Sequence, residues 1–177
     1  PYTKDFAMIH YGPWDRLDNN APFVSGYGIK PLGCQYYPAD ITPEEYEAYH
    51  HPDKGSLYTV LRRGEDGALQ TLWYHQAYAK EVAEMCKLLD SAAQMAEDPA
   101  MKKYLLARKK AFETDDYYAS DLAWMDMKTG KLDFVVGPIE NYDDNLNKAK
   151  ASYEAYVLLK DEARSKELGK FIGMLPS

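Results

Sequence analysis

Cysteine and histidine are scarce in this chain of 177 residues. The two cysteines, Cys34 and Cys86, lie far apart in different surroundings, so we expect free and largely buried thiols in place of a disulfide framework. No HExxH or HExxxH pattern occurs, and the adjacent rings of His50 and His51 would point about 100° apart in a helix. We therefore predict no metal site within this chain.

Basic clusters and long apolar runs are also absent. The net charge is −7, which argues against a nucleic-acid partner because neutralising phosphates requires clustered Lys and Arg. No apolar segment is long enough to cross a bilayer, so we expect no membrane partner. The sequence contains no P-loop, dinucleotide-binding glycine motif or nucleophile elbow. The chain begins at Pro1, so the lack of a targeting segment says little about the compartment, for which we favour the cytoplasm.

Tyrosine, in contrast, is abundant, with 16 residues against 5 Phe and 3 Trp. Tyrosine combines a large ring with a hydroxyl, which suits half-buried walls and grooves, although simple packing at the surface is its more frequent use. The length predicts one domain, residues 1–177, with a core of its own.

The first part of that domain, residues 1–40, is rich in Pro, Gly, Asn and aromatic residues. This composition predicts an extended arm with turns and no long helix. A solvated linker would not need large aromatic side chains, so we expect the arm to lie over an apolar surface. If that surface belongs to another part of a larger protein, an aromatic patch near Trp14, Tyr36 and Tyr37 should be exposed here.

Residues 41–177 predict an α+β fold, predominantly helical with a small, mostly antiparallel β-sheet. The loop chemistry at 64–67 favours a β-hairpin, and Thr42 and Asp98 precede prolines as helix caps do. Apolar residues at spacings of three to four predict the other helices. We expect strands at 57–63, 68–74 and from 132, and helices at 43–50, 76–97, 99–112, about 117–125, 146–157 and 168–175.

The stretch 132–144 combines an apolar strand, a predicted turn at Gly-Pro and a cluster of carboxylates. Asp143 and Asp144 are explained as caps of the helix expected next. Asp133 and Glu140 are not at capping positions. A carboxylate held at a strand end can bind a cation such as a free amine, whereas the alternative is a structural pair with a nearby Lys or Arg.

Two further motifs are Gly-Pro-Ile-Glu-Asn-Tyr-Asp-Asp at 137–144 and Lys-Ala-Ser-Tyr-Glu-Ala-Tyr-Val at 150–157. Both resemble segments of the dipeptidyl-peptidase III family of zinc metallopeptidases. Trp-Asp-Arg-Leu-Asp at 14–18, Tyr-Pro-Ala-Asp at 37–40 and Thr-Asp-Asp-Tyr-Tyr at 114–118 resemble the bacterial branch. In this order, the motifs extend over most of the chain.

The resemblance implies that this chain is the N-terminal, non-zinc lobe of such an enzyme, and is inactive alone. The family holds zinc with two histidines of one helix and a later glutamate, and none of these is present, so zinc is implied only for the full-length parent. The implied partners are a peptide substrate and a C-terminal zinc lobe of the same protein. Some relatives are fused to a Nudix hydrolase domain, but this chain has no Nudix box.

The resemblance also suggests substrate-binding residues. In the family, an acidic residue and a tyrosine beside the Gly-x-Ile-Glu turn bind the free amino terminus and the backbone of the peptide. The acidic position falls on Asp133, with Glu140 and Tyr142 as further candidates, whereas the tyrosine position falls on Val135. The alternative function is that of a free-standing, non-enzymatic domain that binds a peptide or a protein.

Overall fold

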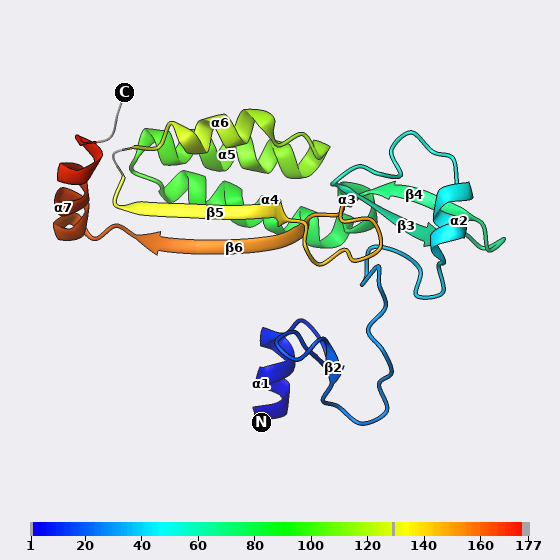
Figure 1. Ribbon diagram of the computed structural model, residues 1–177. Helices are drawn as coiled ribbons and strands as arrows, with labels where there is room; N and C mark the ends of the chain where they lie inside the picture. Colours follow the sequence, from blue (N-terminus) through cyan, green and yellow to red (C-terminus); the bar gives the residue numbers. More distant parts are fainter. Residues whose placement is uncertain (1, 129, 175–177) are drawn as a thin grey trace.

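The computed structural model describes residues 2–128 and 130–174. Figure 1 shows a layer of helices over a long β-hairpin, a smaller hairpin unit at one end, and an N-terminal arm on the opposite side of the long hairpin. The α+β prediction is confirmed, since seven helices and three two-stranded antiparallel sheets occur in the described part. The elements are α1 (Tyr2–Ile9), β1 (Trp14–Asp15), β2 (Ala21–Pro22), α2 (Pro43–Ala48), β3 (Thr59–Arg63), β4 (Leu69–Trp73), α3 (Tyr74–Ala77), α4 (Ala79–Met95), α5 (Pro99–Thr114), α6 (Tyr118–Met125), β5 (Leu132–Glu140), β6 (Ser152–Leu159) and α7 (Glu162–Ile172).

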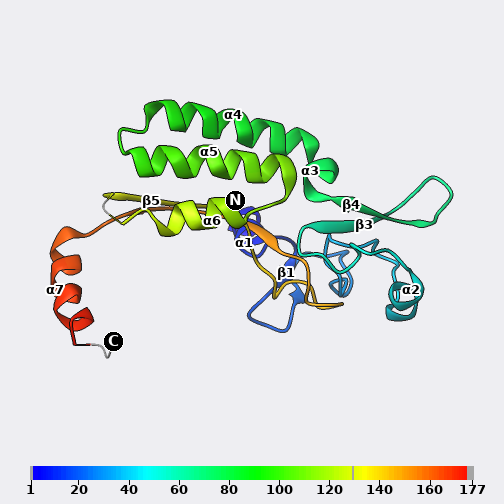
Figure 2. The same cartoon turned by 90° about the horizontal axis from the view of Figure 1, so that it is seen from above.

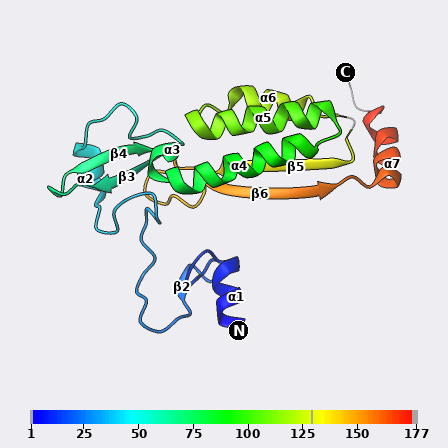
Figure 3. The same cartoon turned by 180° about the vertical axis from the view of Figure 1, so that it is seen from behind.

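The N-terminal arm begins with a short helix, α1, and continues through the small β1–β2 hairpin into irregular chain. Figure 3 shows it set apart from the helical layer, joined to the rest by a long connection. Its own packing centre is His10, which is buried against the rings of Phe6 and Phe23. The His10 Nδ1 atom also accepts a hydrogen bond from the backbone N–H of Arg16 at 3.0 Å, which holds the first turn after the helix.

The smaller unit consists of β3, β4 and α2. As predicted, Thr42 caps α2, its Oγ1 accepting a hydrogen bond from the N–H of Glu45 at 3.1 Å. Leu61 of β3 is fully buried against Tyr37 and Tyr46, so this unit has a small core of its own.

The helical layer is formed by α4, α5 and α6. Figure 2 shows α4 and α5 side by side above the hairpin. Asp98 caps α5, its carboxylate accepting from the N–H of Ala100, so the predicted boundary is confirmed. The main core lies between these helices and the hairpin, and contains Val82, Cys86, Leu89, Ala93, Met101, Tyr104, Leu105, Ala111, Phe112, Tyr117 and Ala123. No helix in the described ranges is long and apolar enough to span a membrane.

Two expectations about the long hairpin are wrong. The chain does not turn at Gly137-Pro138, because β5 continues to Glu140. The helix expected at 146–157 is also absent, and residues 152–159 form β6, which pairs with β5 along its length. Tyr and Val favour strands, and here the cross-strand pairing prevails over a weak helical spacing. The final predicted helix, expected at 168–175, is present as α7, but α7 begins at Glu162, six residues earlier, and ends at Ile172. Leu175, which was expected to belong to it, lies outside the described residues.

Gly137 allows β5 to pass close to Arg108 of α5. Its φ angle is +146°, a conformation that side-chain-bearing residues rarely adopt. A Cβ atom at this position would lie 3.2 Å from Nη1 of Arg108. Arg108 is itself buried between the rings of Tyr104 and Tyr117, with its guanidinium bound to Asp121 at 2.6 Å. The glycine therefore leaves room for the guanidinium.

The loop between β5 and β6 is held by two buried charged residues. The carboxylate of Asp144 accepts hydrogen bonds from the backbone N–H groups of four residues: Leu146, Asn147, Ala149 and Lys150. The ammonium of Lys150 donates to the carbonyls of Lys54 and Ser56 and to Oγ1 of Thr59. Together they fix the loop against the smaller unit.

Candidate functional site

The long hairpin has one face packed on the main core and an opposite face that lies outside this core. Phe134 and Val136 of β5 and Tyr153 of β6 pack against the core. Because side chains alternate along a strand, their neighbours point to the other side. We call this side the open face; it is made up of Asp133, Val135, Glu154, Tyr156 and Leu158.

The register places the residues of the open face in opposite pairs. Val135 is paired with Tyr156, and Asp133 with Leu158. Directly opposite residues of an antiparallel pair lie on the same side with Cβ atoms roughly 5 Å apart. The phenol of Tyr156 therefore lies across from the apolar side chain at position 135.

Asp133 is half-buried near one end of the hairpin. Its Oδ1 atom accepts a hydrogen bond from Nε1 of Trp124 in α6 at 2.9 Å. Within residues 2–128 and 130–174 it forms no ion pair, so the structural alternative of a Lys or Arg partner has no support there. The indole fixes one oxygen and leaves the carboxylate able to accept a further donor.

Glu140 and Tyr142, the other two predicted site residues, lie at the opposite end of β5. Glu140 lies seven positions along the chain from Asp133, which corresponds to roughly 23 Å along a strand. The side chain of Glu140 is exposed, and its carbonyl accepts from Oγ of Ser152 at 2.9 Å. The ring of Tyr142 lies 5.3 Å from the guanidinium carbon of Arg16. The structure thus does not gather the three predicted residues at one point, but distributes them along the same hairpin.

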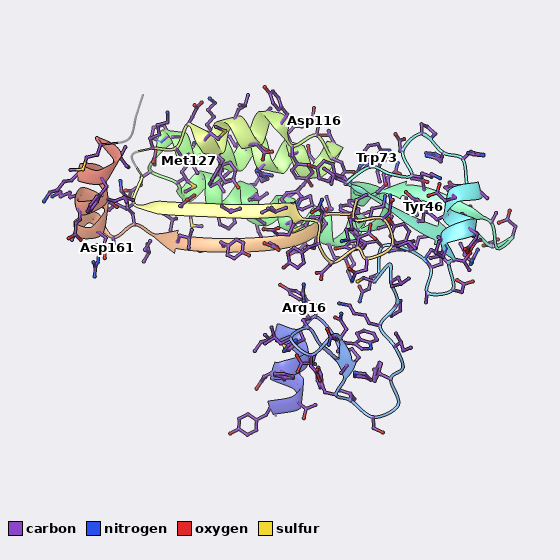
Figure 4. The ribbon with its side chains drawn as sticks, viewed as in Figure 1. Arg16, Tyr46, Trp73, Asp116, Met127 and Asp161 are labelled. Carbon is purple, nitrogen blue, oxygen red and sulfur yellow. The ribbon has the colours of Figure 1, made fainter. Side chains whose placement is uncertain are left out.

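A cleft of about 470 Å³ lies where the arm meets this second end of the hairpin. Figure 4 places Arg16 at the top of the arm, below the hairpin. The guanidinium of Arg16 forms an ion pair with Asp143 and lies over the rings of Tyr11 and Tyr142. The cleft is lined by Tyr11, Trp14, Arg16, Lys30, Pro31, Cys34, Gln35, Tyr36, Tyr74, Tyr78, Tyr142, Asp143, Ala151, Ser152, Tyr153, Glu154 and Tyr156.

The thiol and two of the phenols that line the cleft have raised pKa values and keep their protons at neutral pH. Burial raises the pKa of the Cys34 thiol, which donates to the carbonyl of Asp143 at 2.9 Å, so this thiol is protonated and unreactive at neutral pH. The hydroxyl of Tyr156 donates to Oε2 of Glu154 at 2.7 Å. This hydrogen bond raises the pKa of Tyr156 to about 12, because loss of the proton would place two negative charges side by side. Burial likewise raises the pKa of Tyr36.

The predicted roles of the acidic residues near helix ends require correction. Asp143 is no cap, since its carboxylate binds Arg16. Asp115, which precedes α6, also has its carboxylate engaged elsewhere: the buried carboxylate binds the backbone N–H and Nδ1 of His75, the latter at 2.6 Å. Asp116 does accept from the N–H of Tyr118, the first residue of α6.

The aromatic patch expected near the arm is only partly present. Trp14 and Tyr36 are half-buried and line the cleft, but Tyr37 is 3% exposed and its hydroxyl donates to Asp144. Glu154 and Tyr156 were not identified from the sequence, because their segment was assigned to a helix. The alternation of Tyr153, Ala155 and Val157 with polar neighbours was the signal of a strand.

The described residues of this chain do not provide a set of ligands for a metal ion. The described ranges contain no group of three or more His, Cys, Asp or Glu side chains placed to hold an ion. The residues present therefore do not fit a zinc site of the usual three or four protein ligands.

Comparisons with known proteins give one family match and two similar solved structures. The sequence profile of Peptidase family M49 matches residues 62–175. The structure of DPP III from Caldithrix abyssi superposes with a TM-score of 0.90 at 39% identity, covering 97% of this chain and 34% of that one. The dipeptidyl-peptidase III from Corallococcus sp. strain EGB gives a TM-score of 0.82 at 34% identity, covering 93% and 32%.

A plant protein is also similar in sequence. Nudix hydrolase 3 of Arabidopsis thaliana is 26% identical over 221 aligned positions, which cover 94% of this chain and 28% of that protein. The chain therefore spans about a third of the length of the relatives it matches.

Proposed function

The chain belongs to peptidase family M49, and from this premise we propose that it forms the peptide-binding part of a zinc-dependent dipeptidyl-peptidase. The predicted resemblance to the dipeptidyl-peptidase III family is confirmed by the profile and by both bacterial structures. The zinc and the residues that hold it are assigned to the remaining part of a longer protein, because the described residues offer no ligand set. On this proposal the 177-residue chain alone does not hydrolyse peptides.

The observation that carries the proposal is the position of Asp133 on the open face. Its carboxylate is held by Trp124 through one oxygen and forms no ion pair within the described ranges. A peptide's free ammonium is a suitable partner, since a charge-assisted hydrogen bond to a carboxylate is roughly twice as strong as a neutral one. A carboxylate fixed on a strand also sets a fixed distance from the amino terminus to any bond that is cleaved, which is what release of a dipeptide requires.

The open face is also suited to an extended peptide. Val135, Tyr156 and Leu158 give it apolar surface beside Asp133, and these side chains belong to paired strands, whose geometry is rigid. Tyr156 lies opposite Val135 and supplies a phenol there. The related peptidases carry their tyrosine at the position of Val135 itself. Glu140 and Tyr142, at the far end of β5, contribute only to longer peptides on this proposal.

The test is binding of a pentapeptide amide to the purified chain by isothermal titration calorimetry, with the amino terminus either free or acetylated. We expect the free amine to bind at least fivefold more tightly, and Asp133→Asn to remove that difference. Glu65→Gln, an exposed carboxylate in the distant β3–β4 loop, is the matched control and should leave it unchanged.

Two results would contradict the proposal. Equal binding of free and acetylated peptides would favour the alternative of a non-enzymatic binding domain. Release of dipeptides by the purified chain in the presence of zinc would overturn the assignment of the metal site to another part of the protein.

A further inference from the structure

Glu154 is a second carboxylate on the open face without a basic partner. Its only side-chain hydrogen bond is from the hydroxyl of Tyr156, and it forms no ion pair in the described part of the chain. The two cations that line the same cleft are already engaged. Arg16 is paired with Asp143, and the ammonium of Lys30 donates to Oδ1 of Asn20 at 3.3 Å.

Tyrosine rings line the same cleft as this carboxylate. Tyr11, Tyr142 and Tyr156 all line it together with Glu154. Their faces attract cations, and Arg16 already shows this, since its guanidinium carbon lies 5.6 Å from the centre of the Tyr11 ring and 5.3 Å from that of Tyr142. The surroundings of Glu154 therefore favour a basic group in place of an acidic or apolar one.

The spacing of the two carboxylates matches an extended peptide. Glu154 is paired with Gly137, four residues along β5 from Asp133, or about 13 Å at the rise of a strand. The fourth residue of an extended peptide lies about 10 Å from the first, and a lysine or arginine side chain at that position is long enough to cover the remaining distance. The hairpin ends at Leu132, one residue beyond Asp133, so the open face continues only toward Glu154. A peptide anchored by its amino terminus at Asp133 must run in this direction to stay on the face.

We propose that Glu154 binds the basic side chain, lysine or arginine, of the fourth residue of a peptide whose amino terminus lies at Asp133. This inference rests on the proposed function, because it takes Asp133 as the anchor. In an extended peptide the second and fourth side chains point to one side and the third to the other, so a lysine at the third position faces away from Glu154. Tyr156 is a positioning residue, which holds the carboxylate through its hydroxyl.

The experiment uses four pentapeptide amides with free amino termini, carrying lysine or norleucine at the third or the fourth position, titrated into the purified chain by calorimetry. At the fourth position we expect lysine to bind about fivefold more tightly than norleucine, as is typical of an exposed charge pair. At the third position the two should bind equally. Raising the salt concentration should reduce the fourth-position preference.

Variants separate this inference from the proposed function. Glu154→Gln should abolish the lysine preference by weakening only the lysine peptide, whereas Asp133→Asn should weaken both fourth-position peptides equally. Tyr156→Phe should reduce the lysine preference, because it removes the hydroxyl that holds the carboxylate of Glu154. Glu65→Gln, an exposed carboxylate in the distant β3–β4 loop, is the matched control and should keep the preference.

The following results would contradict the assignment of the lysine preference to Glu154. A lysine preference that persists in Glu154→Gln, or that is as large at the third position, overturns the assignment to Glu154. Dependence on the free amine without any lysine preference overturns this inference alone. Absence of binding to all the peptides overturns the proposed function and this inference with it.

Discussion

The hydroxyl of Tyr37 donates a 2.8 Å hydrogen bond to Oδ2 of Asp144, joining residues 107 positions apart in the sequence. Both side chains are buried, and the same carboxylate accepts four backbone N–H groups of its own loop. A buried carboxylate is tolerated only when it is well hydrogen-bonded, and this one is. The pair connects the segment that follows the arm to the loop between β5 and β6.

The first prediction concerns this pair. Asp144→Ala should lower the free energy of unfolding by about 3 kcal/mol or more, because it leaves several buried donors without an acceptor. Urea denaturation followed by tryptophan fluorescence measures the loss. Asp66→Ala, an exposed residue in the β3–β4 loop, is the comparison and should cost less than 1 kcal/mol. Equal effects of the two substitutions would show that the loop is not held through Asp144.

The second prediction concerns Gly137. Gly137→Ala should destabilise the chain by roughly 1–3 kcal/mol, because the backbone is strained for alanine and the new methyl would lie against the guanidinium of Arg108. Gly169→Ala in α7 is the matched control, since nothing lies within 4 Å of its Cβ position and alanine favours helices. The melting temperature should fall for the first variant and stay level or rise for the second. A fall of equal size in both would contradict this explanation.

The third prediction concerns pH. Burial lowers the pKa of Lys150 to about 8, below its ordinary value of 10.5, so the unfolded chain binds more protons than the folded chain between these values. Stability should therefore increase as the pH rises from 8, by about 1–2 kcal/mol at pH 9.5, and the gain should be lost as the pH falls through 8. Urea unfolding at pH 7.5 and 9.5 measures it.

Lys150→Met provides the control for this pH effect. Its overall stability should be lower, because the carbonyls of Lys54 and Ser56 lose their donor, but its stability should not increase between the two pH values. Above pH 10 both proteins should lose stability, since burial raises the pKa of Tyr74 and other tyrosines, so they resist ionisation only in the folded state. A pH response of equal size in both proteins would exclude Lys150 as its source.

The fourth prediction concerns the attachment of the arm. Arg16→Gln should increase hydrogen exchange of the backbone amides in α1, because it removes the ion pair to Asp143 and the contacts with two tyrosine rings. The cost should be about 1 kcal/mol, as both partners are only partly buried. Arg164→Gln, an exposed residue of α7, is the control and should leave α1 unchanged. Unaltered exchange in α1 with Arg16→Gln would show that other contacts hold the arm.

Local chemistry accounts for the elements that were predicted correctly. Thr42 and Asp98 cap helices through their own side-chain oxygens, and the β3–β4 hairpin follows from a Gly-rich loop between apolar strands. Each of these signals comes from residues a few positions apart in the sequence, so it can be recognised without knowledge of the fold. β6 was misassigned because its spacing fits a weak helical pattern, and only pairing with β5 selects the strand.

The residues of the candidate site were likewise predicted only where the signal was local in the sequence. The sequence identified Asp133 and the segment around Gly137, and its resemblance to a peptidase family pointed to the correct family. It did not identify Glu154 or Tyr156, because their position on the open face depends on the cross-strand register. It also could not show that Glu140 lies far from Asp133, since that distance follows from β5 continuing through Gly137-Pro138.

The sequence by itself therefore determined the fold class, most helix boundaries, the family and one carboxylate of the proposed site. Composition, capping and short motifs act over a few residues, and they are sufficient for these conclusions. The tertiary structure decided which carboxylates share a face, which acidic residues are buried as supports and where the arm meets the hairpin. Those properties depend on contacts such as Tyr37–Asp144 and Arg16–Asp143, whose partners are more than 100 residues apart and meet only when the chain is folded.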